Sequence, residues 1–183
     1  TRNITTIVFD KTGTITEGKP VVTDLLPYGE HTKVTVLQLA ASAEDGSEHP
    51  LGEAIVAAAK QQKLTFSSVS HFQAVPGHGI TGRLDGKDVL LGNKKLMDQK
   101  QIDVSSVIAS AEGLANQGKT PMYVAMDGAL IGLLAVADTV NTSSAQAIER
   151  LHQMGIKVAM ITGDNSRTAQ AIADQVGIDE VIS

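Results

Sequence analysis

The stretch TTIVFDKTGTITEGKP, from Thr5 to Pro20, decides the fold that the sequence predicts. Residues 6–9 are apolar or β-branched, which predicts a buried strand. The strand ends at Asp10, and a turn containing Gly13 follows it. Open α/β sheets bind their ligands at the carboxyl ends of the strands, so a carboxylate at this position indicates a functional site.

Composition favours the same class of fold. The chain has 183 residues, of which 42% are hydrophobic, and this content permits a substantial core. Only 3% of the residues are aromatic and none is Trp, so Ala, Val, Ile and Leu must fill the interior. Parallel sheets covered by helices are often built from these residues, which favours an α/β fold.

Charge and cysteine content exclude several classes of function. The formal charge is −5 without a long basic run, which argues against nucleic acid and anionic membranes as partners. Because Cys is absent, there are no disulfides or thiolate metal sites, and we expect a reducing, cytosolic setting. No apolar run approaches the roughly 20 residues of a membrane span. The start TRNITT lacks Met and the apolar core of a signal peptide, so we expect a soluble piece of a longer protein.

The middle of the chain changes in texture several times. A strand is predicted over residues 21–26, and helices over residues 34–43 and 51–60, the second beginning just after Pro50. Residues 67–92 form short alternating segments separated by PGHG and DG, which predicts antiparallel hairpins. This part of the chain therefore indicates an α+β unit.

The remaining segments alternate between helix and strand. A helix over residues 104–117 precedes a hairpin at Asp127–Gly128, and helices are predicted over residues 143–154 and 167–176, the last ended by Gly177. The strand KVAMITGD lies between these two helices and ends in polar residues. This alternation of strand and helix predicts a parallel-sheet domain made of residues 1–18 and 136–183, with an α+β domain, residues 19–135, inserted in it.

The segment GLANQGKT, from Gly113 to Thr120, matches the phosphate-binding loop of P-loop NTPases letter for letter. That loop must follow a strand and begin a helix. Here a helix is predicted before the segment, and Pro121 with MYVAM predicts a strand after it. We therefore interpret Gly118 as a helix C-cap, with Lys119 near the negative end of the helix dipole.

Asp10 has the chemistry of a nucleophile. A carboxylate is ionised at neutral pH and needs no base, but an anion that attacks a phosphoryl group needs Mg²⁺ and fixed donors to offset repulsion. The following residues, Lys11 to Thr14, offer backbone N–H groups and hydroxyls for that purpose. The alternative is ordinary, since an Asp after a strand is usually a turn residue or a helix cap.

The seven residues DKTGTIT resemble the phosphorylation motif of P-type ATPases, which usually has Leu where this chain has Ile15. The resemblance implies a haloacid-dehalogenase-like α/β phosphorylation domain, incomplete at its C-terminus, with an inserted α+β nucleotide-binding domain that contains an antiparallel sheet. It also implies that Asp10 accepts the γ-phosphoryl group of ATP and that the carbonyl of Thr12 helps to hold Mg²⁺, with Lys11 beside them. Related phosphatases carry a second Asp at the position of Thr12, so an acyl phosphate here should live longer.

Two further stretches resemble elements of this family. TGDN is similar to the second phosphate-site element, which implies roles for Thr162, Gly163 and Asp164, with Thr162 donating to the phosphoryl group. The alternative is an N-cap for the following helix, and both can hold together. Asp138 in ADTV is similar to an acid near the nucleotide and the hinge, although Asn141 stands where the family often has a basic residue.

The stretches SEHPLG and PGHG of this chain resemble nucleotide-binding signatures of the heavy-metal-transporting subclass. The resemblance implies that His49 contacts adenine and that Glu48 is its neighbouring contact. Glycines would allow the backbone to approach phosphates and ribose closely. Taken alone, each of these residues would be a structural residue, a turn or a cap. The other implied nucleotide-binding residues are Gly77, Gly79, Ile80, Gly92 and Asn93.

Within the subclass, Glu before the His-Pro pair is more similar to copper(I) or silver transporters than to zinc or cadmium transporters. The implied partners are ATP, a transported metal ion bound elsewhere, and the transmembrane and actuator domains of a parent chain at the cytoplasmic face of a membrane. A downstream Mg²⁺-binding motif of the family is missing, so we expect the chain to bind nucleotide better than it reacts with it. The alternatives are a phosphatase or phosphotransferase with a cap domain, and a binding module only.

Overall fold

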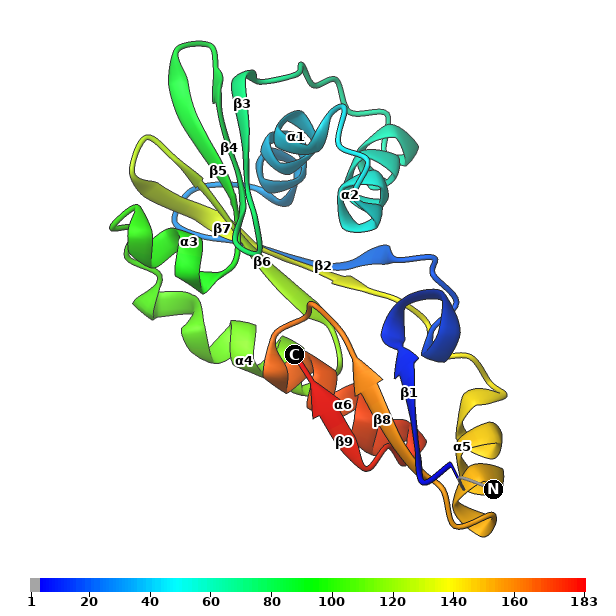
Figure 1. Cartoon of the computed structure of the whole chain (residues 1–183). Coiled ribbons are helices and arrows are strands. Elements are labelled where there is room, and N and C mark those ends of the chain that lie inside the picture. The colour runs from blue at the N-terminus through cyan, green and yellow to red at the C-terminus, as the bar shows by residue number, and fades with distance from the viewer. Residues whose placement is uncertain (1–3) are drawn as a thin grey trace.

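The computed structural model describes residues 4–183, so the first three residues of the predicted segment 1–18 lie outside the described residues. Figure 1 shows two sheets, each with its own helices. We call the larger sheet with helices α1 to α4, residues 21–137, the inserted lobe. The smaller sheet, with the segments on either side of the inserted lobe, is the parallel lobe. The predicted division into two domains at residues 18 and 135 stays a prediction.

The parallel lobe is built on a three-stranded parallel sheet with the order β1-β8-β9. Two helices, α5 (Ser144–Gln153) and α6 (Ser166–Val176), share one apolar cluster with this sheet. Gly177 ends α6 in the left-handed conformation, as the sequence predicts. The α/β fold class is thus confirmed, whereas the short strand β9 was not anticipated. The strands are β1 (Thr6–Asp10), β8 (Lys157–Ile161) and β9 (Glu180–Ile182).

The prediction that residues 6–9 form a buried strand is wrong in one respect. They form β1, but Val8 is 52% exposed. The strand lies at the edge of its sheet, where side chains alternate between faces, and Phe9 packs against the apolar cluster of α5 and α6. Val8 and Asp10 alternate with Phe9 and are both exposed. The same alternation therefore leaves the Asp10 carboxylate accessible.

The inserted lobe is built on a six-stranded antiparallel sheet with the order β2-β7-β6-β5-β4-β3. The hairpin at Asp127–Gly128 joins β6 to β7, and residues 67–92 contain β3 to β5, which confirms the predicted hairpins. The strands are β2 (Val21–Pro27), β3 (Ser70–Val75), β4 (Gly79–Leu84), β5 (Lys87–Gly92), β6 (Thr120–Met126) and β7 (Ala129–Ala137).

Helices cover both faces of the six-stranded sheet (Figure 1). Successive residues of β5 point to opposite faces of the sheet and so contribute to two separate cores. Val89 and Leu91 join the cluster of α1 and α2, whereas Leu90 joins the cluster on the other face. The helices are α1 (Lys33–Glu44) and α2 (Pro50–Gln61) on the first face, and α3 (Lys94–Gln99) and α4 (Ile108–Asn116) on the second.

Two helical predictions need correction. The predicted helix over residues 104–117 is shorter, because Ser105–Val107 form a 3₁₀ turn and α4 begins at Ile108. The helix α3 was not predicted, since two turns are too short to show a clear apolar period. None of the helices formed by residues 4–183 combines the length and the apolar character of a membrane span.

Candidate functional site

Asp10 is the last residue of β1, and its side chain is exposed. The chain then turns sharply over Lys11–Ile15, where Gly13 takes a φ of +75° that L residues rarely adopt. Asp10 pairs in register with Ile161, the last residue of β8. The two parallel strands therefore end side by side, and the segments after them form one rim of the sheet.

Residues far along the chain fasten the turn after Asp10. The carbonyl of Ile15 accepts hydrogen bonds from the Asn141 backbone N–H (2.9 Å) and the Ser144 hydroxyl (3.0 Å). The Asn141 side chain donates from Nδ2 to the carbonyls of Thr14 (3.0 Å) and Thr16 (3.1 Å). Asn141 thus holds the backbone of this turn in place. Its neutral amide can fill this role, which the sequence analysis did not anticipate.

Lys11 and Asp164 tie the two rim segments together. Lys11 Nζ lies 2.6 Å from Asp164 Oδ2, and the two side chains are only 11% and 13% exposed. Asp164 Oδ2 has no hydrogen bond with any other group among the described residues. A buried charge that loses its partner is costly, so each of these groups holds the other in place.

Thr162 follows β8 directly and is half-buried. Its Oγ1 accepts a hydrogen bond from the Asp164 N–H (3.1 Å), which leaves the hydroxyl hydrogen available for a ligand. Gly163 is exposed. Asn165 is the N-cap of α6, because its Oδ1 accepts from the Thr168 N–H (3.0 Å), so the cap interpretation of TGDN holds for Asn165.

Asp138 lies where the chain passes between the lobes. Its Oδ2 accepts from the Thr16 hydroxyl (2.6 Å) and the Gly18 N–H (3.0 Å), and its Oδ1 accepts from the Lys19 N–H (2.9 Å). The carboxylate therefore clasps the two crossing segments to each other. Its predicted position at the hinge agrees with this geometry, while its predicted contact with a nucleotide stays a prediction.

His49 is the N-cap of α2 and precedes Pro50 at the first helical position. Its Nδ1 accepts a hydrogen bond from the Leu51 N–H (3.3 Å), and its own N–H donates to Ser47 Oγ (3.2 Å). An accepting Nδ1 is unprotonated, so Nε2 carries the ring hydrogen of the neutral imidazole and can donate to a ligand. Glu48 beside it is exposed.

Glu44, at the end of α1, is a buried acid that the sequence analysis missed. It is 6% exposed, and burial raises the pKa of its carboxyl above its usual value, while a Ser47 hydrogen bond lowers it. A Cβ added at Gly52 would collide with Glu44 Oε2. The only signal in the sequence was an acid ending an apolar helix five residues before His49. A hollow of about 280 Å³ adjoins this loop, lined in part by Glu44 and Ser47.

The glycines of the PGHG and LLGN segments come together. Gly79 pairs with Gly92 across β4 and β5, where an added Cβ on either would collide with the backbone of the opposite segment. Asn93 caps α3 and donates from Nδ2 to the Gly77 carbonyl (2.8 Å). Gly77 has a φ of +71° and open space around it, whereas Ile80 is buried. Among residues 4–183, no hydrogen bond links His49 to this glycine cluster.

The oxygen groups at Asp10 suit Mg²⁺. Lys11 pairs with Asp164, so within the described part of the chain no cation occupies the Asp10 carboxylate. No group of three His, Asp or Glu among residues 4–183 could hold a metal ion by itself. Mg²⁺ commonly uses one or two carboxylates and completes its shell with water and substrate phosphates. Asp10 and a backbone carbonyl therefore fit Mg²⁺ that arrives with a nucleotide.

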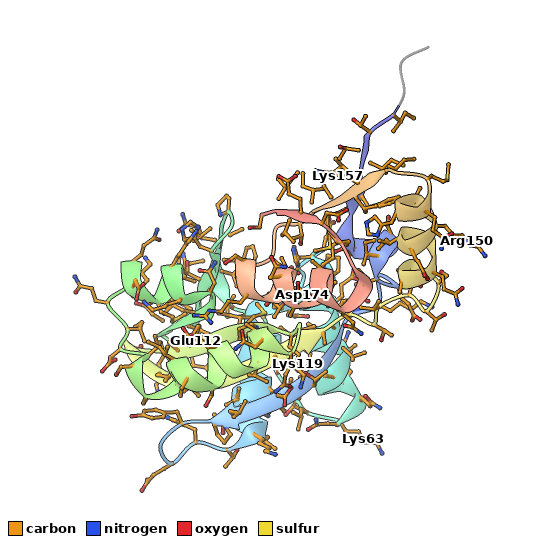
Figure 2. All side chains as sticks on the ribbon, turned by 90° about the horizontal axis from the view of Figure 1, so that it is seen from below. Lys63, Glu112, Lys119, Arg150, Lys157 and Asp174 are labelled. Carbon is orange, nitrogen blue, oxygen red and sulfur yellow. The ribbon has the colours of Figure 1, made fainter. Side chains whose placement is uncertain are left out.

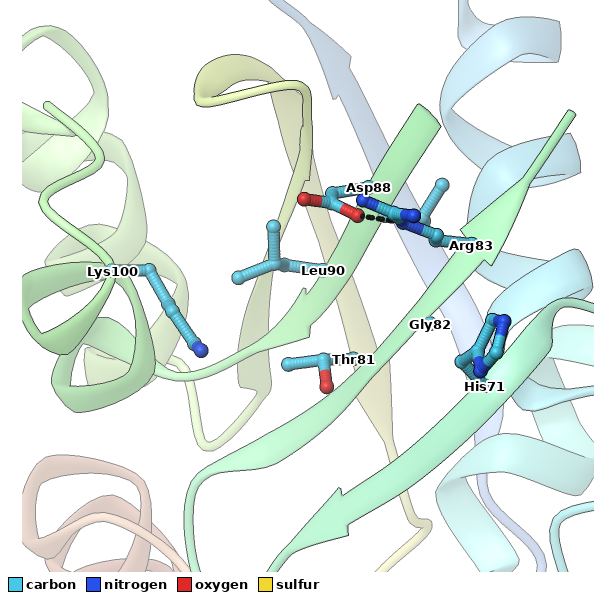
Figure 3. Close-up of a pocket in the computed structure, with 8 residues that line it drawn as sticks. His71, Thr81, Gly82, Arg83, Asp88, Leu90 and Lys100 are labelled. Atoms are coloured by element: carbon cyan, nitrogen blue, oxygen red, sulfur yellow. Dashed lines mark hydrogen bonds and ion pairs between the residues drawn. The ribbon is translucent and has the colours of Figure 1, made fainter. Parts of the chain in front are cut away.

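A second hollow, about 390 Å³, lies elsewhere, on the α3 side of β4 and β5. Figure 3 shows Lys100 reaching across it towards Thr81, with the Arg83–Asp88 ion pair (2.7 Å) on neighbouring strands. It contains no residue that the sequence analysis singled out. Its charged side chains are exposed, so it carries no functional assignment.

Comparisons with known proteins bear on the whole chain. Residues 4–183 match the family described as haloacid dehalogenase-like hydrolase. The copper-exporting P-type ATPase of Bacillus subtilis (strain 168) is 47% identical over 183 residues, which are 100% of this chain and 23% of that protein. The protein of the same name from Staphylococcus aureus (strain JH9) is 52% identical over 184 residues, covering 100% of this chain and 22% of that protein. The chain therefore spans less than a quarter of these relatives.

Solved structures similar to this chain also come from ATPases. A zinc-transporting PIB-type ATPase in the E2.Pi state superposes with a TM-score of 0.69 and 33% identity, over 97% of this chain and 28% of that one. The catalytic domain of the CPx-ATPase CopB-B, from a study of changes upon nucleotide binding, gives a TM-score of 0.72 and 26% identity, over 99% of this chain and 61% of that one.

Proposed function

The chain belongs to the haloacid dehalogenase-like hydrolases, within which its relatives are P-type ATPases, and from this premise we propose that it is the nucleotide-binding and phosphate-accepting part of a copper-transporting ATPase. The observation that carries the proposal is the exposed Asp10 carboxylate at the end of β1, beside the buried Lys11–Asp164 pair and the free hydroxyl of Thr162. The proposal assigns residues 1–18 and 136–183 to phosphorylation and residues 19–135 to nucleotide binding.

In the proposed reaction, a carboxylate oxygen of Asp10 attacks the γ-phosphorus of ATP. A bond from that oxygen to phosphorus forms, the bond from phosphorus to the β,γ-bridging oxygen breaks, and ADP leaves with the electron pair. Mg²⁺, held by Asp10 and the Thr12 carbonyl, would neutralise charge between the two anions. The Thr162 hydroxyl and the Gly163 N–H donate to phosphoryl oxygens, while Lys11 and Asp164 fix the two rim segments.

The inserted lobe would supply the nucleotide. His49 presents Nε2–H to the adenine, with Glu48 next to it. The Ser47 hydroxyl accepts a hydrogen bond from the His49 backbone N–H, and the buried Glu44 lies just before this loop. Gly77 leaves open space for phosphates or ribose beside Gly79, Gly92 and Asn93. Copper(I) as the transported ion, the transmembrane and actuator domains, and the cytoplasmic face of a membrane belong to the same proposal. The copper-exporting relatives support them.

The test uses the full-length protein that contains this chain. After incubation with Mg²⁺ and ATP labelled in the γ-phosphate, the wild type should incorporate hydroxylamine-labile phosphate. Asp10→Asn should abolish this label, because an amide is not a nucleophile at neutral pH. Asp174→Asn, an exposed acid on α6, is the matched control and should label normally. Unchanged labelling of Asp10→Asn would remove Asp10 from the mechanism.

A further inference from the structure

The Gly118-Lys119-Thr120 segment, which imitates a phosphate-binding loop in sequence, has a different role in the fold. It is the turn between α4 and β6 in the inserted lobe, and it packs against α6 of the parallel lobe. Figure 2 shows Glu112 and Lys119 on the side of the inserted lobe that faces α6, which carries Asp174. The two lobes therefore meet at a second place besides the clasp at Asp138.

One buried hydroxyl makes the central contact of this junction. Thr168, on the first turn of α6, is 1% exposed, and its Oγ1 donates to the Lys119 carbonyl at 2.6 Å. The same Oγ1 accepts from Asn165 Nδ2 at 2.8 Å. Asn165 is the last residue of TGDN and the N-cap of α6. A continuous path of hydrogen bonds thus runs from the segment after β8 to the inserted lobe.

The rest of the junction is closely fitted. Gly118 has a φ of +77°, and a Cβ added there would lie 2.8 Å from Ile172 Cδ1 of α6. The Lys119 side chain binds within its own lobe, where Nζ lies 2.7 Å from Asp24 Oδ2 on β2. This hydrogen bond lowers the pKa of Asp24. Arg167 and Glu112 add an exposed ion pair at 3.1 Å. Lys119 is therefore held at its carbonyl by Thr168 and at its Nζ by Asp24.

We propose that Thr168 is a positioning residue that seats the inserted lobe on α6 and so sets where the nucleotide lies relative to the rim that carries Thr162 and Asp10. Thr168 is buried, and it acts through Asn165 and the Lys119 carbonyl. This inference rests on the proposed function for its effect on catalysis. The seating itself does not depend on that function.

The first measurement is an interlobe distance in the 183-residue chain. Spin labels are attached at Gln61→Cys on α2 and Glu149→Cys on α5, two exposed positions. Because the chain has no other Cys, the labels report only the distance between the two lobes. Thr168→Val keeps the shape but leaves a buried carbonyl unpaired, so we expect the released arrangement to gain about tenfold in population and the distance distribution to widen. Thr168→Ser retains the hydroxyl and should restore the narrow distribution.

A glycine pair guards against a variant that fails to fold. Gly118→Ala would place a Cβ 2.8 Å from Ile172 Cδ1, whereas Gly155→Ala, at a similar φ of +76°, meets open space. We expect Gly118→Ala to widen the distance distribution and Gly155→Ala to leave it narrow. Circular dichroism confirms that each variant is folded. Distributions for Thr168→Val and Gly118→Ala as narrow as the wild type would overturn the proposal, whatever the outcome of phosphorylation experiments.

The second measurement separates positioning from binding. In the full-length protein, Thr168→Val should lower the rate of phosphate incorporation while the ATP affinity stays within about twofold of the wild type, because no nucleotide-binding residue has been moved. Thr168→Ser should recover the rate. Loss of affinity in proportion to the loss of rate would contradict a positioning role. Absence of labelling in the wild type as well would refute the proposed function and leave the distance result standing.

Discussion

Lys11 and Asp164 show how a single buried pair shapes the rim at Asp10. The motif places a cation directly after the Asp10 carboxylate, yet Lys11 turns to Asp164, on the segment after β8. This leaves Asp10 exposed and, among residues 4–183, without a competing cation. The pair therefore acts first on the geometry of the site, by joining the ends of two parallel strands.

Removing one partner of this pair should be strongly destabilising. Asp164→Ala leaves the Lys11 charge buried without a partner, and such changes cost about 3–5 kcal/mol. The double variant Lys11→Met/Asp164→Leu should recover most of the loss, since it removes both charges and fills the space. Urea unfolding of the 183-residue chain measures both. A single variant as stable as the wild type would show that the pair carries no structural role.

Glu44 predicts a dependence of stability on pH with a definite sign. Burial raises the pKa of its carboxyl in the folded chain above 4.5, its ordinary value, so the folded state binds a proton that the unfolded state has released. The stabilisation is fully present below the ordinary value and is lost as pH rises through the raised one. Glu44→Gln imitates the protonated form, and we expect it to remove this decline.

The measurement compares urea unfolding of the wild type and Glu44→Gln in steps from pH 4 to pH 8, about the range that buried carboxyl groups cover. The free-energy difference should shift in favour of the variant as pH rises. Glu53→Gln, an exposed acid on α2, is the control and should show no such trend. A constant difference for Glu44→Gln across the range would contradict the raised pKa.

At the scale of elements, the N-terminus of α2 combines a structural role with a proposed binding role. His49 caps the helix through Nδ1, and this contact leaves Nε2 as the donor of an exposed ring. The two roles can be separated, because Asn is also a good N-cap but lacks the imidazole.

We expect His49→Ala to lower stability by about 1 kcal/mol through loss of the cap and His49→Asn to keep it. Both variants should weaken ATP binding by about tenfold, the loss of one well-placed hydrogen bond. Calorimetric titration of the 183-residue chain with ATP measures affinity, and thermal unfolding measures stability. His31→Ala, an exposed loop variant, is the control. Equal ATP affinity of the wild type and His49→Asn would remove the imidazole from the nucleotide site.

Local chemistry in the sequence was enough to predict most elements. Pro50 at the start of α2, Gly177 after α6 and the Asp127–Gly128 hairpin each act within a few residues, so their effect shows in the sequence. The rejection of a phosphate-binding loop at Gly118 rested on the same kind of signal, and α4 before it and β6 after it confirm that rejection.

What the sequence could not predict depends on distant contacts. Asn141 and Ser144 hold the turn after Asp10 from more than 120 residues away, and no local pattern marks them. The exposure of Val8 follows from the edge position of β1 and from the packing of α5 and α6 on the face that carries Phe9, which is a property of the assembled sheet. Burial of Glu44 depends likewise on α2 folding back over the end of α1, with Gly52 against its carboxyl.

At the scale of the whole molecule, the two lobes are joined by contacts of different kinds. The Asp138 clasp holds the crossing segments by three hydrogen bonds, and the Thr168 junction holds the lobes at a second place. A hinge with a second contact restricts the directions in which the lobes can move. The proposed transfer of a phosphoryl group from a nucleotide on one lobe to Asp10 on the other needs such control of position.

The central claim is that Asp10 is the group that accepts phosphate. In the full-length protein, brief incubation with Mg²⁺ and ATP followed by borohydride converts an acyl phosphate on Asp to homoserine, which mass spectrometry locates in the chain. We predict homoserine at position 10, formed only when ATP is present. Homoserine at another acid, or none at position 10 while labelled phosphate is incorporated, would contradict the account.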